Sequence, residues 1–121
     1  MKTGRKISGG KYHKSRKSKK YEQAGEPRMV KLGKEKKKKL KMLGGKMKTV
    51  LLSTSTVNII NKKTKKSEKA KIKNVIETPS NKFLARQNIL MKSAIIETDK
   101  GKARITNRPS QEGCVQAVLI E

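Results

Sequence analysis

The chain has few aromatic residues: its 121 residues include no tryptophan, one phenylalanine and two tyrosines. Proteins that read single-stranded nucleic acids stack the bases on several aromatic rings, so we exclude a stacking platform. A membrane-binding amphipathic helix would need Trp, Phe or Leu along one face, and this chain offers little of that. No hydrophobic run reaches transmembrane length, and none of signal-peptide length follows the basic N-terminus. We therefore expect neither a secretory signal nor a membrane partner.

The residues that catalysis requires are also scarce. A single cysteine, Cys114, excludes an internal disulfide and a zinc site built on cysteine pairs, and it favours a reducing compartment. Cys114 has no histidine near it in the sequence, so we expect a buried or half-buried small side chain rather than a nucleophile. The only histidine, His13, lies in a strongly basic stretch, where a polar side chain that contacts phosphate or water is favoured over a general base. We expect no catalytic residue, metal, cofactor or small-molecule substrate, and hence not an enzyme.

Positive charge is abundant and unevenly distributed. The chain has 33 Lys and Arg against 9 Asp and Glu, a net charge of +24. Positions 1–48 hold 19 of these basic residues with only 3 acidic ones, and only 5 Leu, Ile, Val or Phe. A segment this charged and this poor in apolar side chains cannot offset its own ordering entropy. We predict that residues 1–48 form a basic extension that is irregular when free and binds a concentrated polyanion, most simply a nucleic acid.

Within the extension, residues 1–33 have no sustained period and are interrupted by glycine and proline. Residues 34–43 contain good helix formers, so a short helix formed only against a partner is possible there, ending at Gly44-Gly45. For the lysine run Lys36–Lys39, nucleic-acid contact is about as favoured as the alternative, a solvated linker or a localisation signal.

Residues 49–121 can bury a core. They hold 20 Leu, Ile, Val and Phe, gathered into seven short bursts of strand length at 50–52, 57–60, 72–76, 89–91, 94–96, 103–105 and 115–120. Strands at this spacing are typical of an all-β sandwich or barrel. Asp99-Lys100-Gly101 predicts a hairpin between 95–98 and 102–106. Residues 62–67 predict an exposed loop, Pro79 and Pro109 predict strand ends, and 81–86 is ambiguous between helix and strand.

The segment from Gly4 to Lys20 gives the best signal for nucleic-acid contact, because its cations alternate with glycine and serine. Lysine greatly outnumbers arginine, which favours point-charge contact with phosphate over bidentate reading of bases. An architectural DNA-binding protein remains an alternative, although no helix-turn-helix or zinc finger is apparent. The candidate RNA-binding residues are the basic side chains Lys2, Arg5, Lys6, Lys11, His13, Lys14, Arg16, Lys17, Lys19, Lys20, Arg28, Lys46, Lys48, Arg86, Arg104 and Arg108.

The order of several short segments resembles one protein family. They are Thr3–Lys11, Lys20–Pro27, Gly44–Lys48, Asn81–Ile89, Lys92–Thr98, Gly101–Thr106 and Arg108–Glu121. In order and spacing they are similar to small-subunit ribosomal protein eight of the e-type, shared by archaea and eukaryotes. The long insertion typical of eukaryotic members is absent, so the resemblance is to the short archaeal form and covers essentially the whole chain.

This resemblance implies a structural constituent of the small ribosomal subunit that supports translation in the cytoplasm. It implies an all-β fold: a small antiparallel β-barrel of about six strands, residues 49–121, with a long irregular basic N-terminal extension, residues 1–48, threaded into ribosomal RNA. The implied partners are small-subunit ribosomal RNA and neighbouring ribosomal proteins. A relative in the same family acts in ribosome assembly, so an assembly factor is a further alternative.

Overall fold

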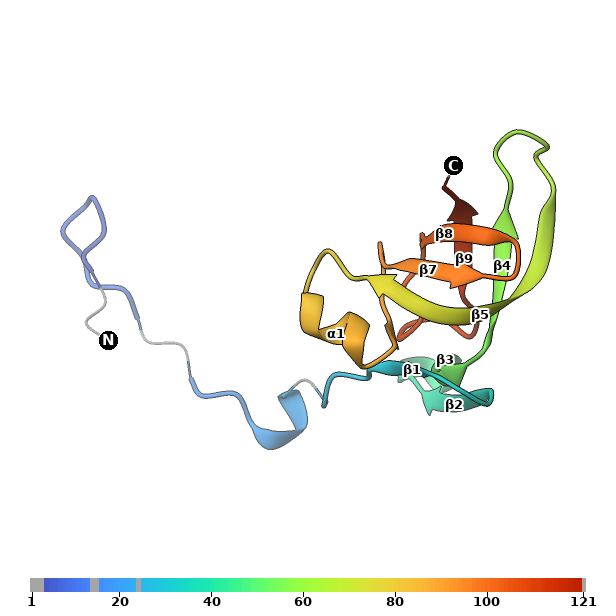
Figure 1. Cartoon of the computed structure of the whole chain (residues 1–121). Coiled ribbons are helices and arrows are strands. Elements are labelled where there is room, and N and C mark those ends of the chain that lie inside the picture. Colours follow the sequence, from blue (N-terminus) through green and yellow to red (C-terminus); the bar gives the residue numbers. More distant parts are fainter. Residues whose placement is uncertain (1–3, 14–15, 24, 121) are drawn as a thin grey trace.

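The computed structural model describes residues 4–13, 16–23 and 25–120, and most of its regular structure is β-strand. Figure 1 shows a body made of the strands, from which the described N-terminal residues extend outward as a separate strip of chain. We call this strip the arm: the described residues 4–13, 16–23 and 25–29. A 3₁₀ turn, η1 (Lys20–Glu22), is its one helical element.

Five strands close into a barrel in the order β4-β5-β7-β8-β9. They are β4 (Thr56–Ile60), β5 (Ser67–Glu77), β7 (Ile95–Thr98), β8 (Gly101–Ile105) and β9 (Gln116–Leu119). Neighbouring strands are antiparallel except at the closure, where β4 and β9 run parallel. The all-β prediction is confirmed, but the barrel has five strands in mixed orientation rather than about six antiparallel ones.

The other four strands form a second sheet in the order β2-β3-β1-β6. They are β1 (Val30–Leu32), β2 (Lys36–Lys41), β3 (Met47–Thr54) and β6 (Ile89–Leu90). Strand β3 ends one residue before β4 begins, so the chain passes from this sheet into the barrel at Ser55. Two of the seven apolar bursts, those in β3 and β6, therefore belong to this sheet and not to the barrel, which is why the predicted strand number was too high.

Regular structure begins earlier in the chain than predicted. Strands β1 and β2 lie within residues 1–48, and the predicted boundary after Lys48 falls inside β3. The irregular part of the extension is therefore shorter than the sequence suggested. The possible helix at 34–43 is wrong: β2 pairs antiparallel with β3, from Lys41↔Met47 to Lys36↔Ser53. The division into a binding extension and a barrel domain stays a prediction.

A turn with two consecutive left-handed glycines closes the β2–β3 hairpin. It contains η2 (Leu43–Gly45), in which Gly44 and Gly45 have φ values of 73° and 74°. Such backbone angles cost little for glycine and are strained for most other residues. Gly44-Gly45 was expected to stop a helix, and in the structure it turns a hairpin instead.

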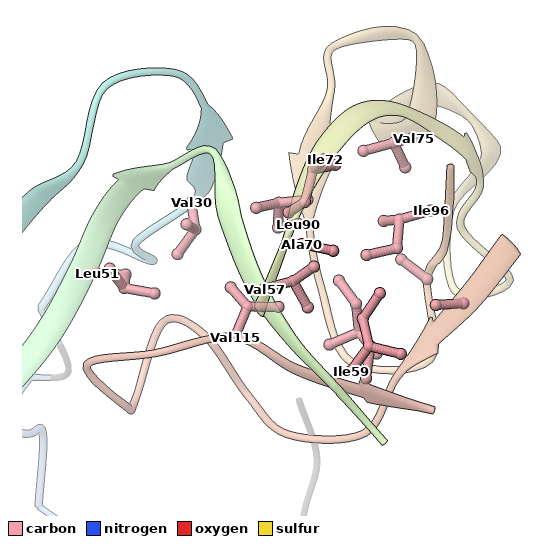
Figure 2. Packing of buried hydrophobic residues seen from close by; sticks show 14 residues of the cluster. Val30, Leu51, Val57, Ile59, Ala70, Ile72, Val75, Leu90, Ile96 and Val115 are labelled. Carbon is pink, nitrogen blue, oxygen red and sulfur yellow. The ribbon is translucent and has the colours of Figure 1, made fainter. Parts of the chain in front are cut away.

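One continuous apolar cluster joins the sheet to the barrel. Figure 2 shows it running from Val30 and Leu51 at the sheet to Val75 and Ile96 inside the barrel. Along β5, buried Ala70 and Ile72 alternate with exposed lysines, as expected for a strand with one face on the core. Val30 is the first buried residue of the described chain, so the arm contributes nothing to the core.

The locally signalled elements form as expected. Strands β7 and β8 pair antiparallel from Thr98↔Gly101 onward, which confirms the predicted hairpin. Residues 61–66 connect β4 to β5 as an exposed loop, apart from the half-buried Asn61. The ambiguous segment forms a short helix, α1 (Lys82–Arg86), and the Phe83 backbone N–H donates to the Asn81 side-chain oxygen at 3.0 Å. Asn81 thereby acts as an N-cap.

Candidate nucleic-acid interface

The first part of the arm folds back on itself in a tight turn. Arg5 and Lys11 form an antiparallel bridge, and the Lys6 backbone N–H donates to the Gly10 carbonyl at 2.9 Å. Gly9 sits at the turn with φ 81°, and the Arg5 guanidinium donates to its carbonyl at 3.0 Å. The Lys6 ammonium lies 5.7 Å from the centre of the Tyr12 ring. All these residues are exposed, so the turn presents its cations to solvent.

A second turn is built around one carboxylate. The Arg16 guanidinium donates two hydrogen bonds to Glu22, at 2.7 and 2.6 Å, and the Lys19 backbone N–H donates a third at 3.0 Å. The Arg16 contact, helped by the Lys19 N–H, lowers the pKa of Glu22 below its usual range, and the same contact raises the pKa of Arg16. Arg16 already binds Glu22. The cations of this turn that are more available to an external anion are therefore Lys17, Lys19 and Lys20.

Three predicted residues meet on the body near the loop that follows β8. The Arg28 Nε donates to the Ser110 carbonyl at 3.5 Å, and the Lys48 ammonium donates to the Gln111 side chain at 2.5 Å. Arg108 lies in the same loop and is exposed. Arg28, from the end of the arm, is thus held beside Arg108, which is 80 positions later in the sequence. Sequence reasoning named these residues but could not bring them together.

The other predicted body residues are dispersed. Lys46 is exposed at the β2–β3 turn, Arg86 lies at the end of α1, and Arg104 is exposed on β8. Arg86 and Arg104 line two separate surface hollows. Lys2 and Lys14 lie outside the described residues.

Two rows of exposed cations lie outside the predicted set of RNA-binding residues. Lys69, Lys71 and Lys73 share the outer face of β5, although Lys73 lies 3.8 Å from Asp99 across an ion pair. Their alternation with buried residues was the signal that could have found them. Lys36 to Lys39 and Lys41 line β2, which is an edge strand. Lysines on an edge strand discourage pairing with another sheet. This row can therefore serve a structural role as well as a binding role.

Metal-binding side chains do not cluster in the described part of the chain. No set of three or more His, Cys, Asp and Glu side chains there could hold a metal ion. Cys114 is exposed, not buried as expected, because buried Val115 and Ala117 face the core and the alternating positions face outward. His13 is an exposed residue of the arm. Among the described residues, no helix is long and apolar enough to span a bilayer.

The fold and charge define a class: a small basic β-barrel protein with a cationic arm, suited to a polyanion. Comparison with known proteins makes the class specific. The profile of the family "Ribosomal protein S8e" matches residues 1–120. The chain is 43% identical to small ribosomal subunit protein eS8 of Sulfurisphaera tokodaii, over 97% of this chain and 92% of that protein. It is 40% identical to the protein of the same name from Methanocella arvoryzae, over 98% and 95%, and 41% to that of Nanoarchaeum equitans, over 95% and 91%.

The chain therefore belongs to the ribosomal protein S8e family, with archaeal relatives about 40% identical over nearly their full length. The resemblance noted from the sequence is confirmed. Members of this family are ribosome components and not enzymes.

Proposed function

We propose that the protein is a structural constituent of the small ribosomal subunit, in the cytoplasm, and that it binds ribosomal RNA through phosphate and shape. The arm supplies most of the affinity, and the β body supplies a second, more dispersed set of contacts. Neighbouring ribosomal proteins are further partners. The family relationship supports the ribosomal role, since relatives that match this chain over 91–95% of their own lengths carry the name of a small-subunit protein.

The observation that carries the RNA-binding part is the separation of charge from core. Residues 4–23 include eight Lys and Arg against one Glu, and every described residue among them is exposed. The buried apolar residues begin at Val30. A cationic strip whose described residues are all exposed can gain contacts from a polyanion, because neutralising phosphates releases counterions.

The contacts available to the arm are mainly electrostatic and local. Lysine ammonium groups act as point charges toward phosphates, while serine hydroxyls and glycine N–H groups can donate to phosphate oxygens. The turns at 5–11 and 16–22 give the strip a shape, so it can follow the crevices of a folded RNA better than a featureless polycation. Where the arm joins the body, Arg28 of the arm and Lys48 of the body bind the loop that contains Arg108, which gives a further cationic contact point.

The test is binding of the full chain to small-subunit ribosomal RNA from the same organism. The protein should co-sediment with small subunits at moderate salt, and it should bind the purified RNA more tightly than duplex DNA at matched salt. Its affinity should fall steeply with salt, with a log–log slope of about −0.7 to −0.9 for each phosphate neutralised.

A variant in which residues 4–23 are scrambled provides the matched control, because it keeps length, composition and charge. If shape matters, the scrambled arm keeps the salt slope but loses preference for ribosomal RNA. Equal affinity for duplex DNA and ribosomal RNA would favour an architectural DNA-binding protein. Recovery only in ribosome-free fractions would contradict the structural role.

A further inference from the structure

A large hollow of the body lies beside the end of the arm, next to β1. It is a groove of about 910 Å³ lined by four parts of the sequence that are distant from one another: residues 25–30, then Pro79, Ser80 and Leu84, then residues 89–93 and 108–111. Its size lies within the range of roughly 300–1,000 Å³ that holds small ligands. Arg28 and Ser110, which face each other across two of these segments, are joined by the 3.5 Å hydrogen bond already described.

The floor of the groove is apolar. Buried Val30, Ile89 and Leu90 come from β1 and β6, and half-buried Leu84 and Met91 border them. Because no aromatic side chain lines the groove, a flat ligand would pack here against aliphatic and thioether groups rather than stack on a ring.

The rim of the groove is cationic. Arg28, Lys92 and Arg108 line it against one acidic residue, Glu26. Three serine hydroxyls, from Ser80, Ser93 and Ser110, lie among the same lining residues. Cations and hydroxyls around an apolar floor suit a ligand with one flat apolar part and one anionic part.

We propose that this groove receives an unstacked nucleotide of the ribosomal RNA, with the base on the apolar floor and the phosphate at the cationic rim. The proposal rests on the proposed function and deepens it. A purely apolar protein segment would leave the excess positive charge of the rim, three cations against Glu26, without a partner, and a duplex backbone would leave the floor unused. The groove begins where the arm ends, so RNA that neutralises the arm leads directly to it. Base contact here needs no aromatic platform.

A single tryptophan can report occupancy, because the natural chain contains none. Met91→Trp places the indole on the floor of the groove. Phe83→Trp is the control: Phe83 is 71% exposed on α1 and is not among the lining residues. Each full-length variant is titrated with short single-stranded oligouridylate and oligoadenylate, and then with small-subunit ribosomal RNA. Fluorescence anisotropy of labelled RNA measures total binding in parallel.

We expect Met91→Trp emission to be quenched as RNA binds, and Phe83→Trp emission to change much less. Adding Arg108→Gln should weaken the binding that produces the quenching and reduce its salt slope by about one. Lys102→Gln removes one positive charge on β8, away from the groove, and should leave both that binding and the quenching at saturation unchanged. If Met91→Trp does not fold, Met29→Trp, at a position 50% exposed on the other wall, replaces it.

Three results would overturn the inference, and each has a different consequence for the proposed function. RNA binding by anisotropy with equal emission changes in both reporters would remove the groove proposal and leave the proposed function standing. No RNA binding by either variant or by the unmodified chain would remove both. An emission change at Met91→Trp on incorporation into small subunits, but not with RNA alone, would assign the groove to a segment of a neighbouring protein.

Discussion

Removing the arm should separate RNA affinity from folding stability. The variant that tests this lacks residues 1–23. All described residues in that range are exposed, and the first buried side chain, Val30, remains with its whole strand β1. We expect the free energy of unfolding, measured by urea denaturation, to change by less than about 0.5 kcal/mol, as for surface changes in general.

The loss of RNA affinity should be large and dependent on salt. Residues 1–23 carry nine Lys and Arg, of which Arg16 is already paired with Glu22. If six to eight of them neutralise phosphates, the log–log salt slope should become shallower by about 4 to 7. This corresponds to roughly a 10²- to 10⁴-fold smaller change in affinity between 50 and 200 mM salt. Filter binding or anisotropy across that range measures it.

A longer deletion provides the control. Removing residues 1–33 also removes β1, which pairs with β3 on one side and β6 on the other. Val30 is 1% exposed, and the loss of its burial alone should cost about 2 kcal/mol. The longer deletion should therefore unfold at lower urea, whereas the shorter one should not. If the variant lacking residues 1–23 keeps the salt slope of the full chain, the prediction is refuted, because the arm then makes no contact with phosphate.

Two further predictions concern the body and the arm separately. Ile96→Ala, at a fully buried position of β7, should destabilise the protein by about 2–5 kcal/mol without changing the dependence of the unfolding free energy on urea. Ile76→Ala, at a position 43% exposed on β5, should have a much smaller effect. Urea unfolding followed by far-UV circular dichroism compares the two variants, and equal losses of stability would contradict the assigned core. In the arm, the lowered pKa of Glu22 means that its contact with Arg16 persists above the usual glutamate pKa and is lost as pH falls through the lowered value. NMR shifts of Arg16 and Lys19 should report that transition, and Glu22→Gln should abolish it. If the natural chain shows no such transition, the contact between Arg16 and Glu22 is contradicted.

The sequence predicted elements that depend on near neighbours and missed those that depend on distant ones. All seven apolar bursts contribute residues to strands, and Asp99-Lys100-Gly101 turns the β7–β8 hairpin, because burial alternation and turn residues are local properties. The parallel pairings β4–β9 and β1–β3 join segments far apart in the chain. No turn residue signals such a pairing, and the expected antiparallel barrel did not include it.

Strand β2 shows why composition misled. Lysine is depleted in strands, and a run of four lysines gives no apolar alternation to read. Yet β2 needs only backbone hydrogen bonds to β3 on one side, and its other side is a sheet edge where exposed lysines are favourable. Tertiary pairing therefore overrode a weak local preference, and the ordered body began before the predicted boundary.

The candidate interface divides in the same way. The arm could be located from charge and composition, since exposure follows from the absence of anything to bury. The groove could not, because its walls come from four segments that only the second sheet and the loop after β8 bring together.

The end of the arm next to β1 connects the two parts of the candidate interface, the arm and the groove. Because β1 is held by β3 on one side and β6 on the other, the position of Val30 is fixed by the core, and so is the start of the arm. The Arg28 contact with Ser110 extends that anchoring two residues further toward the N-terminus. Stability of the body therefore determines where the arm begins, while the affinity of the arm depends on residues that the body does not need. A change in β1 or β6 should alter both properties, whereas a change before residue 25 should alter affinity alone.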